Sequence, residues 1–416
     1  MMICHPCNIW VAIALVAFLM VDTSEASMMI KMPHYKRGWS HMDISSYMDA
    51  QSQVHGNEGE AHGKPNVPKG AQLITLPVGN GGEKIPVYWS VSPNNSQVEQ
   101  AFVMMHGRLR DGDHYWSIMH KVLKSAKKAH YKGAMKETIV AAPQMYSEKL
   151  NKGQYDNETL AWDDVNAWES GAIATHPQGT NASSMDALDA IIDHFSNKTA
   201  FPNMKNVTMV GHGGGAQLMN RYAITGKDPA NSTIHVRYIV GDPSSSPYFT
   251  KHRPVTDKSI ASKSKCHGYN TWRYGFHNFT GTLDSKLDAK DYFGRYVQRD
   301  VVNLIGHKDV KPNGDQKCMA LLQGGHKRRD RNMSWWRYIN TLARTKEDLA
   351  GFPGNFSHLP DWSDTYKGNF SVRLAIVQQA AHNVEKVFSG KIGRSALFDD
   401  YSVEEGWRPK KNSSSH

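Results

Sequence analysis

The sequence predicts an α/β fold: a mostly parallel central sheet with helices on both faces. Short apolar segments recur along most of the chain, and segments with apolar residues at helical spacing alternate with them. Such alternation is typical of βα units on a parallel sheet. The 416 residues fit one large domain or two of medium size, so the length alone does not decide between them.

The expected parallel strands are uninterrupted apolar runs, the pattern of strands buried on both faces. They cover residues 101–105, 138–142, 207–210, 236–240, 301–305 and 374–377. Before them, residues 73–78 and 85–89 flank a glycine-rich turn, which predicts a hairpin. Helices are expected at 115–129, at 184–195, where Ser184 begins the segment as a cap would, at 217–224, and within the aromatic and basic stretch 316–345.

The two ends of the chain differ in composition from its middle. Residues 27–70 have no sustained apolar period and are expected to be a mobile arm, and 401–416 a polar tail. One folded domain is expected over 71–400. Within it, residues 243–299 are full of aromatic side chains without a clear period, so we expect an inserted cap over the site.

Three features predict an exported glycoprotein. Residues 1–26 are interpreted as a signal peptide, because an apolar run too short to span a bilayer precedes small residues; the absence of Lys and Arg before the run leaves an uncleaved anchor as an alternative. After removal of the leader, Cys266 and Cys318 remain, and one disulfide is the simplest outcome, with two unpaired thiols as the alternative. Eleven Asn-x-Ser/Thr sequons are present: Asn94, Asn157, Asn181, Asn197, Asn206, Asn231, Asn278, Asn332, Asn355, Asn369 and Asn412.

The chain is basic, and this restricts its partners only loosely. Its net charge is +10, and loss of Asp22 and Glu25 with the leader would raise it to +12. Such a charge attracts polyanionic surfaces without selecting among them. The densest basic cluster, residues 326–331, is expected to be a solvated helix face. No nucleic-acid motif surrounds it, so no nucleic-acid partner is expected.

Residues 207–218 carry the most informative motif: a buried strand, a glycine turn and a helix. This is the layout of a nucleophile elbow, in which G-x-S-x-G places the nucleophile on a sharp turn and small flanking residues let strand and helix pack closely. Both flanking glycines, Gly211 and Gly215, are present, but the central residue is Gly213, and G-x-S-x-G occurs nowhere in the chain. We therefore predict a turn that keeps its shape and lacks the attacking oxygen.

The other parts of a catalytic triad follow in the order acid, then histidine. Asp309 comes soon after the strand 301–305 and is predicted to be the acid; His382 follows the last strand and is predicted to be the base. Oxyanion-hole amides are expected from Arg108, after the strand 101–105, and from Gly214.

Two neighbouring histidines receive no catalytic role. His106 is expected to shape the oxyanion loop, and His212 is interpreted as a neighbour of the nucleophile position. The 21 histidines show no metal-site spacing, so neither a metal nor another cofactor is expected.

Over residues 73–400 the chain resembles the α/β-hydrolase superfamily, and within it a group of secreted hydrolase-like proteins, mainly fungal. The resemblance implies an esterase-, lipase- or peptidase-like ancestry, and Gly213 implies loss of ordinary serine-hydrolase activity. Ala381 and Asn383 stand beside His382 where Gly-His-Asp would be more familiar. The segments that carry the resemblance are HGRLRD at 106–111, GHGGGAQ at 211–217, GHKD at 306–309, His382, and the stretches 269–275 and 323–325 near the two cysteines.

Three functions stay open at this point. The leading hypothesis is a pseudoenzyme that binds a small-molecule, acyl, glycan or peptide ligand in the inherited pocket. The second is an active hydrolase that uses a serine within 244–246 or an activated water. The third is a dinucleotide-binding turn, because Gly211, Gly213 and Ala216 fit G-x-G-x-x-A; the acidic residue expected about 20 positions on is matched only by Asp242, about 30 after the first glycine.

Overall fold

The computed structural model describes residues 66–163, 166–229, 234–282, 286–356, 358–399 and 402–410. The expected signal peptide, nearly all of the expected arm and the end of the expected tail lie outside these residues. Among the described residues, no helix combines the length and apolar character needed to cross a membrane.

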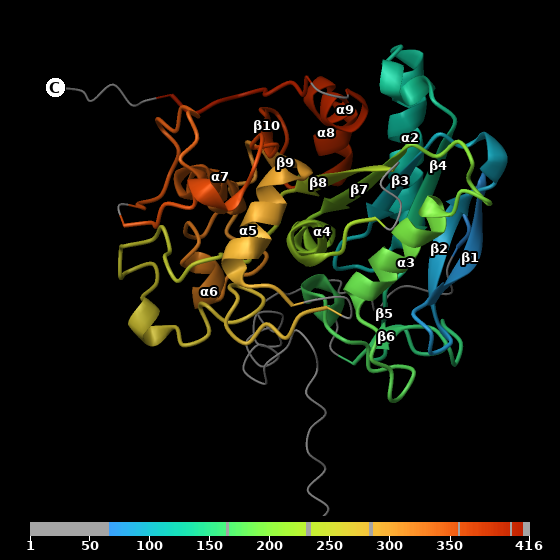
Figure 1. Cartoon of the computed structure of the whole chain (residues 1–416), viewed down its shortest axis with the longest axis horizontal. Helices are drawn as coiled ribbons and strands as arrows, with labels where there is room; N and C mark the ends of the chain where they lie inside the picture. Colours follow the sequence, from blue (N-terminus) through green and yellow to red (C-terminus); the bar gives the residue numbers. More distant parts are fainter. Residues whose placement is uncertain are drawn as a thin grey trace, which may run out of the picture. The chain divides into compact units, whose positions relative to one another are not determined.

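Eight strands of the described chain form one sheet in the order β1-β2-β4-β3-β7-β8-β9-β10 (Figure 1). The hairpin β1–β2 and the pair β2–β4 are antiparallel, and every other neighbouring pair is parallel. The strands are β1 (Ala71–Val78), β2 (Glu83–Ser90), β3 (Gln100–Met105), β4 (Thr138–Pro143), β7 (Asn206–His212), β8 (His235–Gly241), β9 (Asp300–Gly306) and β10 (Arg373–Val377), with a separate small pair β5 (Tyr146–Ser147) and β6 (Ala161–Trp162).

Helices cover both faces of this sheet (Figure 1). On one face lie α2 (Gly112–Lys128), α8 (Val384–Ser389) and α9 (Lys391–Phe398), and on the other α3 (Ser184–Ser196), α4 (Gly214–Thr225), α5 (Ala289–Gln298) and α7 (Arg328–Ala343). The remaining helical turns are α6 (Cys318–Leu321), η1 (Asn95–Gln97), η2 (Lys132–Met135), η3 (Ala167–Ser170), η4 (Lys263–Lys265) and η5 (Ser363–Thr365). The expected α/β class and each expected strand are confirmed.

Strand periodicity assigns the side chains of β3 to the two layers. Ala101, Val103 and Met105 belong to the core on the α4 side, whereas Phe102 and Met104 belong to the core on the α2 side. Because successive strand residues point to opposite faces, an uninterrupted apolar run is what a doubly covered strand requires.

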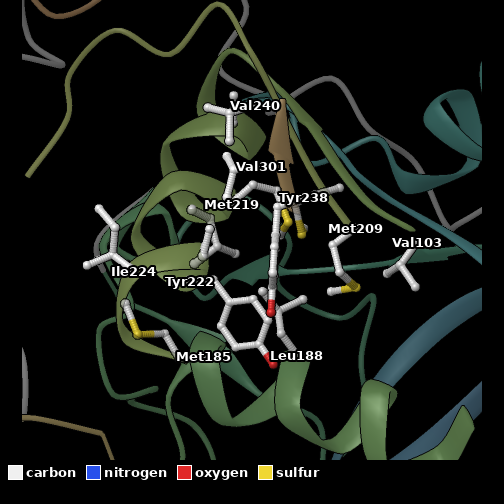
Figure 2. Close-up of a cluster of buried hydrophobic side chains, with 14 of the residues drawn as sticks. Val103, Met185, Leu188, Met209, Met219, Tyr222, Ile224, Tyr238, Val240 and Val301 are labelled. Atoms are coloured by element: carbon white, nitrogen blue, oxygen red, sulfur yellow. The ribbon is translucent and has the colours of Figure 1, made fainter. Parts of the chain in front are cut away.

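The core on the α4 side combines aliphatic side chains with methionines and aromatic rings. In Figure 2, Met219 and Tyr222 of α4 lie among strand residues such as Met209 and Tyr238 and the α3 residue Leu188. The Tyr222 hydroxyl donates a 2.6 Å hydrogen bond to the Asp189 carboxylate, so the phenol is buried with its polar atom satisfied. This packing fixes α4, and therefore the turn that precedes it.

Helix α3 begins at Ser184, where the predicted segment begins, but its cap lies one residue earlier than expected. The cap is Ser183, whose hydroxyl accepts the Asp186 N–H while the Asp186 carboxylate accepts the Ser183 N–H, a capping box. Ser184 is the first helical residue and bonds instead to the Trp168 carbonyl.

The segment expected to form a cap, 243–299, joins β8 to β9. Its last part is α5, which packs beside α4 as the crossover helix between these two strands. Its aromatic side chains are buried: Tyr248, Phe249, Trp272 and Phe279 belong to the main core. The aromatic richness of this segment therefore reflects packing.

Two further expectations concern the two cysteines and the basic cluster. Cys266 and Cys318 form a disulfide, as the simplest interpretation predicted. The interpretation of the basic cluster 326–331 as a solvated face is wrong for two of its residues: Arg328 and Arg331 are each only 2% exposed, whereas His326 and Lys327 are exposed. The sequon at Asn332 is also buried, and its amide donates to the carbonyls of Pro243 and Arg328.

Candidate active site

The glycine turn between β7 and α4 has the backbone of a nucleophile elbow. Gly213 has φ 59° and ψ −116°, a combination that residues with side chains rarely adopt. Its N–H donates to the Gly241 carbonyl at 2.9 Å, and its carbonyl accepts the Gln217 N–H at 3.0 Å. The turn is therefore fixed by neighbouring backbone and does not depend on a side chain at position 213.

Gly215 is required by the close approach of helix and strand. A Cβ atom there would come within 2.5 Å of the His106 carbonyl oxygen and 2.6 Å of the Met105 carbonyl oxygen. A Cβ at Gly211 would collide with the backbone of Gly215. Both flanking glycines thus serve the packing role that the elbow motif demands.

Asp309 and His382, predicted from separate loops, lie together at the ends of β9 and β10. The Asp309 carboxylate is 3.0 Å from His382 Nδ1, and it also accepts a forked pair of bonds from the Arg328 guanidinium at 2.9 and 3.0 Å. Burial raises the pKa of Asp309, but His382 and Arg328 outweigh it and lower the pKa to about 2. Asp309 is therefore a carboxylate that can orient the imidazole.

The other edge of His382 faces Gly213. A Cβ atom at position 213 would lie 3.0 Å from His382 Nε2. Burial, then His212 and Arg328, lower the pKa of His382 to about 4 against the opposing effect of Asp309. The side chain keeps 33% of its surface exposed, so water screens part of this shift, and the imidazole is neutral near pH 7.

The loop after β3 lies beside the elbow, as expected for an oxyanion hole. The Arg108 backbone nitrogen is 3.3 Å from the place that a Cβ on Gly214 would occupy. His106 accepts the Met145 N–H at 3.0 Å through Nε2, and its Nδ1 lies 2.7 Å from the Gly107 carbonyl. Bonded at both nitrogens and buried, His106 holds the loop in place.

Glu169, in η3, was not anticipated from the sequence. Its carboxylate lies directly against the Cα of Gly214, and it accepts a 2.8 Å bond from the Gln217 amide. Burial raises the pKa of this carboxyl to about 7 in spite of three arginines nearby: Arg273, Arg221 and Arg108. A second carboxyl, Asp111, also has its pKa raised to about 7, mainly by burial.

Of the three serines considered as displaced nucleophiles, Ser245 and Ser246 are hydrogen-bonded to other side chains, whereas Ser244 lines the cavity described below. The Ser245 hydroxyl donates to the Gln217 side chain at 2.8 Å, and the Ser246 hydroxyl accepts from Asn220 at 2.9 Å. Within the described part of the chain, the hydrogen-bond partner of the His382 ring is Asp309, and no serine or threonine hydroxyl bonds to it. The geometry therefore gives these serines no activating base.

A cavity of about 520 Å³ opens over these residues. Gly213, Gly214, His382 and Glu169 line it, and the described residues of the expected cap segment contribute Ser244 and Arg273. Basic groups from Arg108, Arg273 and Arg328 share the lining with the two carboxyls whose pKa values are raised.

Comparisons with other proteins agree with this architecture. No family model and no curated protein matches the sequence. Among solved structures, poly(aspartic acid) hydrolase-1 from Sphingomonas sp. KT-1 is similar with a TM-score of 0.50 at 16% identity, covering 78% of this chain and 96% of that one. LpqC, a poly(3-hydroxybutyrate) depolymerase from Bordetella parapertussis, gives a TM-score of 0.52 at 16% identity, covering 79% and 90%.

The chain has the α/β-hydrolase fold. Its glycine turn therefore occupies the elbow position of that fold. The strand order also argues against a dinucleotide-binding interpretation of Gly211, Gly213 and Ala216, because that fold has the order 3-2-1-4-5-6 around its switch point. The α/β-hydrolase fold brings the ends of β3, β7 and β10 to one cavity, where each supplies a predicted residue, and Asp309 after β9 lies behind His382.

Two residues of this site carried a weak signal in the sequence, and one carried none. Arg328 belongs to a run of charged residues, a pattern that indicates exposure to solvent. In the structure it pairs with Asp309, 19 positions away in the sequence, and holds this carboxylate in place. Asp242, with φ 50°, follows β8 just as Asp309 follows β9. Glu169 lies in an irregular segment, where no periodicity could indicate its burial.

Proposed function

We propose that this α/β-hydrolase-fold protein is an exported glycoprotein that has lost its serine nucleophile and binds a ligand in the retained cavity. One observation carries the proposal: the Nε2 edge of the neutral His382 imidazole faces Gly213, which has no side-chain oxygen. The leader-like residues 1–26, the sequons and the disulfide support export.

The energetic consequence of the missing oxygen is large. In a comparable triad enzyme, loss of the nucleophile costs about 10⁶ in rate, and binding with the oxyanion hole retains about 10³ to 10⁴ over water. A cavity that keeps its histidine and its amides can therefore still bind an acyl, glycan or peptide ligand while turning it over too slowly to serve as an enzyme of this type.

The charge around the cavity suggests which part of a ligand it would hold. Three guanidinium groups, those of Arg108, Arg273 and Arg328, line it. This basic lining favours a ligand with a carboxylate or another anionic oxygen. Arg108 and Arg273 both act on Glu169, so a neutral Glu169 would leave more of their charge to the ligand.

A fluorophosphonate probe tests the lost nucleophile, because it labels a serine only when a base activates that serine. We expect no labelling of the natural protein. Gly213→Ser should gain labelling, and Gly213→Ala, which imposes the same backbone strain without the oxygen, should stay unlabelled. His382 must shift by a few tenths of an ångström to admit the new Cβ, so labelling of the serine variant should be slow.

Two outcomes would count against the proposal. Labelling of the natural protein at any serine would show a nucleophile that the geometry does not reveal. Complete silence of a folded Gly213→Ser variant would show that the Asp309–His382 pair does not activate a residue at this position. Folding of each variant can be checked by near-ultraviolet circular dichroism.

A further inference from the structure

Three side chains with metal-binding atoms converge beside Gly213. One ring nitrogen each of His212 and His382 and one carboxylate oxygen of Asp242 lie within 4.8 Å of one another. They come from the ends of β7, β8 and β10, so three strands of the sheet bring them together. The three residues are far apart along the chain, and only the fold brings them together.

Two of these atoms are buried without a hydrogen bond. His212 is 3% exposed and Asp242 is fully buried, and within the described residues neither His212 Nε2 nor Asp242 Oδ2 has a hydrogen-bond partner. They lie 3.6 Å apart, too far for a good hydrogen bond to each other. Leaving a buried polar group unsatisfied is costly, so the arrangement requires a further partner.

Backbone groups fix the orientation of the Asp242 carboxylate. Its other oxygen, Oδ1, accepts the Gly306 N–H at 2.8 Å, and its own N–H donates to the Leu304 carbonyl at 3.1 Å. One oxygen is therefore used to fix the carboxylate, and Oδ2 is left pointing at His212.

His382 is oriented as a metal ligand is. Its Nδ1 faces the Asp309 carboxylate at 3.0 Å, which leaves Nε2 for another contact. Metal-bound histidines almost always give their second nitrogen to a carboxylate or carbonyl in this way. Gly213 keeps the space beside Nε2 open, because a Cβ there would come within 3.0 Å of this nitrogen.

We propose that His212, Asp242 and His382 bind one divalent transition-metal ion, with Zn²⁺ as the best match. Two imidazoles and one carboxylate suit Zn²⁺, whose bonds of about 2.0–2.2 Å in a tetrahedral site place the ligand atoms roughly 3.3–3.6 Å apart. The His212–Asp242 pair already has this spacing. His382 has to approach the pair by about 1 Å, and its partly exposed ring has room to do so.

Three protein ligands leave a fourth position for water or a ligand atom, as in catalytic zinc sites. His212 and His382 both line the cavity, so this position would open toward whatever occupies it. The inference goes beyond the loss of the serine: the ion would anchor an anionic oxygen of the ligand next to the place where the nucleophile is absent.

Zinc titration of the full-length, chelator-treated protein against a chromophoric zinc indicator tests the site. We expect one tight site per chain, and Co²⁺ in place of Zn²⁺ should give the visible absorption of tetrahedral coordination. Asp242→Asn and His382→Ala should each weaken that site by about 100-fold or more, and Asp309→Asn, which removes the carboxylate behind His382, by about 10- to 100-fold.

A matched control comes from the same cavity. His114 lines it but stands outside the cluster, so His114→Ala should leave the tight site unchanged while removing any weak binding that depends on exposed imidazole. His212→Ala is the most direct variant but disturbs a buried position. If it fails to fold, His382→Ala decides the question, because that ring is partly exposed.

The proposal is overturned if the natural protein shows no tight site, or if Asp242→Asn and His382→Ala bind zinc as the natural protein does. In that case His212 and Asp242 form a buried ion pair only. The fluorophosphonate assay is run on chelator-treated protein, because a bound ion would occupy the His382 Nε2 that has to activate the serine of Gly213→Ser. Labelling of the natural protein would then overturn the proposed loss of the nucleophile and leave the zinc titration to be judged by itself.

Discussion

The two sides of the cavity hold buried carboxyls in opposite electrostatic states. On the relay side, formed by Asp309, His382 and Arg328, the pKa of the acid is lowered to about 2. On the elbow side, formed by Gly213, Gly214 and Glu169, the pKa of the acid is raised to about 7. Both acids are nearly inaccessible, at 2% and 5% exposure, so burial alone does not explain the difference.

The difference comes from the donors that each carboxyl receives. Asp309 accepts a forked guanidinium and faces an imidazole, all within 3.0 Å. The Glu169 carboxylate accepts a neutral amide at 2.8 Å, and the combined effect of Arg273, Arg221 and Arg108 on its pKa is smaller than that of burial. Charged donors in direct contact stabilise the ionised form enough to overcome desolvation, whereas a neutral donor does not. The cavity thus keeps a charged acid where a triad needs one.

The largest effect is expected from Asp309→Ala, which removes the centre of the relay side. Arg328 would then be a buried charge without its partner, and breaking a buried pair in this way costs about 3–5 kcal/mol of unfolding free energy. Urea unfolding followed by fluorescence measures this loss. A cost below 1 kcal/mol would mean that Arg328 finds water or another acceptor and that the relay side is not rigid.

Glu169→Gln tests the elbow side and should stabilise the protein at high pH. Because the folded pKa is raised from 4.5 to about 7, stability is full below pH 4.5 and is lost as the pH rises through 7, by at most about 3 kcal/mol. The glutamine cannot ionise, so the variant should lack this loss. Thermal unfolding at pH 5 and pH 8 compares the two proteins, and parallel curves would contradict the assignment.

The relay side should show the opposite dependence on pH in the same experiment. Asp309 has a folded pKa below its ordinary value of 3.8, so its contribution is present above pH 3.8 and is lost as the pH falls toward 2. The free energy of unfolding should therefore decline at both ends of the pH range. Glu169 contributes to the decline at high pH, and Asp309 contributes to the decline at low pH.

The smallest effect concerns the His382 imidazole, in apo protein prepared with chelator. Its folded pKa lies below 6.5, so the unfolded chain binds the proton more readily, and the associated stability is present above pH 6.5 and is lost as the pH falls toward 4. Histidine nuclear magnetic resonance signals, assigned through His382→Ala, should show this ring titrating below the ordinary histidine value of 6.5. An ordinary pKa would mean that solvent in the cavity cancels the effect of burial.

The sequence predicted the parts of the site that are local in the chain. The elbow residues are contiguous in the sequence, and its glycines allow the close packing that any such strand-turn-helix junction requires. Asp309 and His382 were found because parallel strands end at one edge, so a polar residue after each strand falls near the others. Helix boundaries shifted by a few residues, and the cap of α3 moved to Ser183, because the capping hydrogen bonds decide them.

The parts that were missed depend on contacts between distant segments. Charged residues are mostly exposed to solvent, so the sequence predicted an exposed helix face for Arg328. Only the fold shows that Asp309 pairs with the buried Arg328 guanidinium. Glu169 and Asp242 depend in the same way on which loops the sheet places side by side. A single side chain in a loop gives no periodic signal, whether it is buried or exposed.

The disulfide has a practical consequence for handling this protein. Cys266 and Cys318 enclose the stretch that carries α5, β9 and Asp309. A single proteolytic cut anywhere between these cysteines would leave the two fragments covalently joined. Such a nicked molecule would migrate as one species on a non-reducing gel and separate into two pieces only after treatment with a thiol, so purity judged without reductant would overlook the damage.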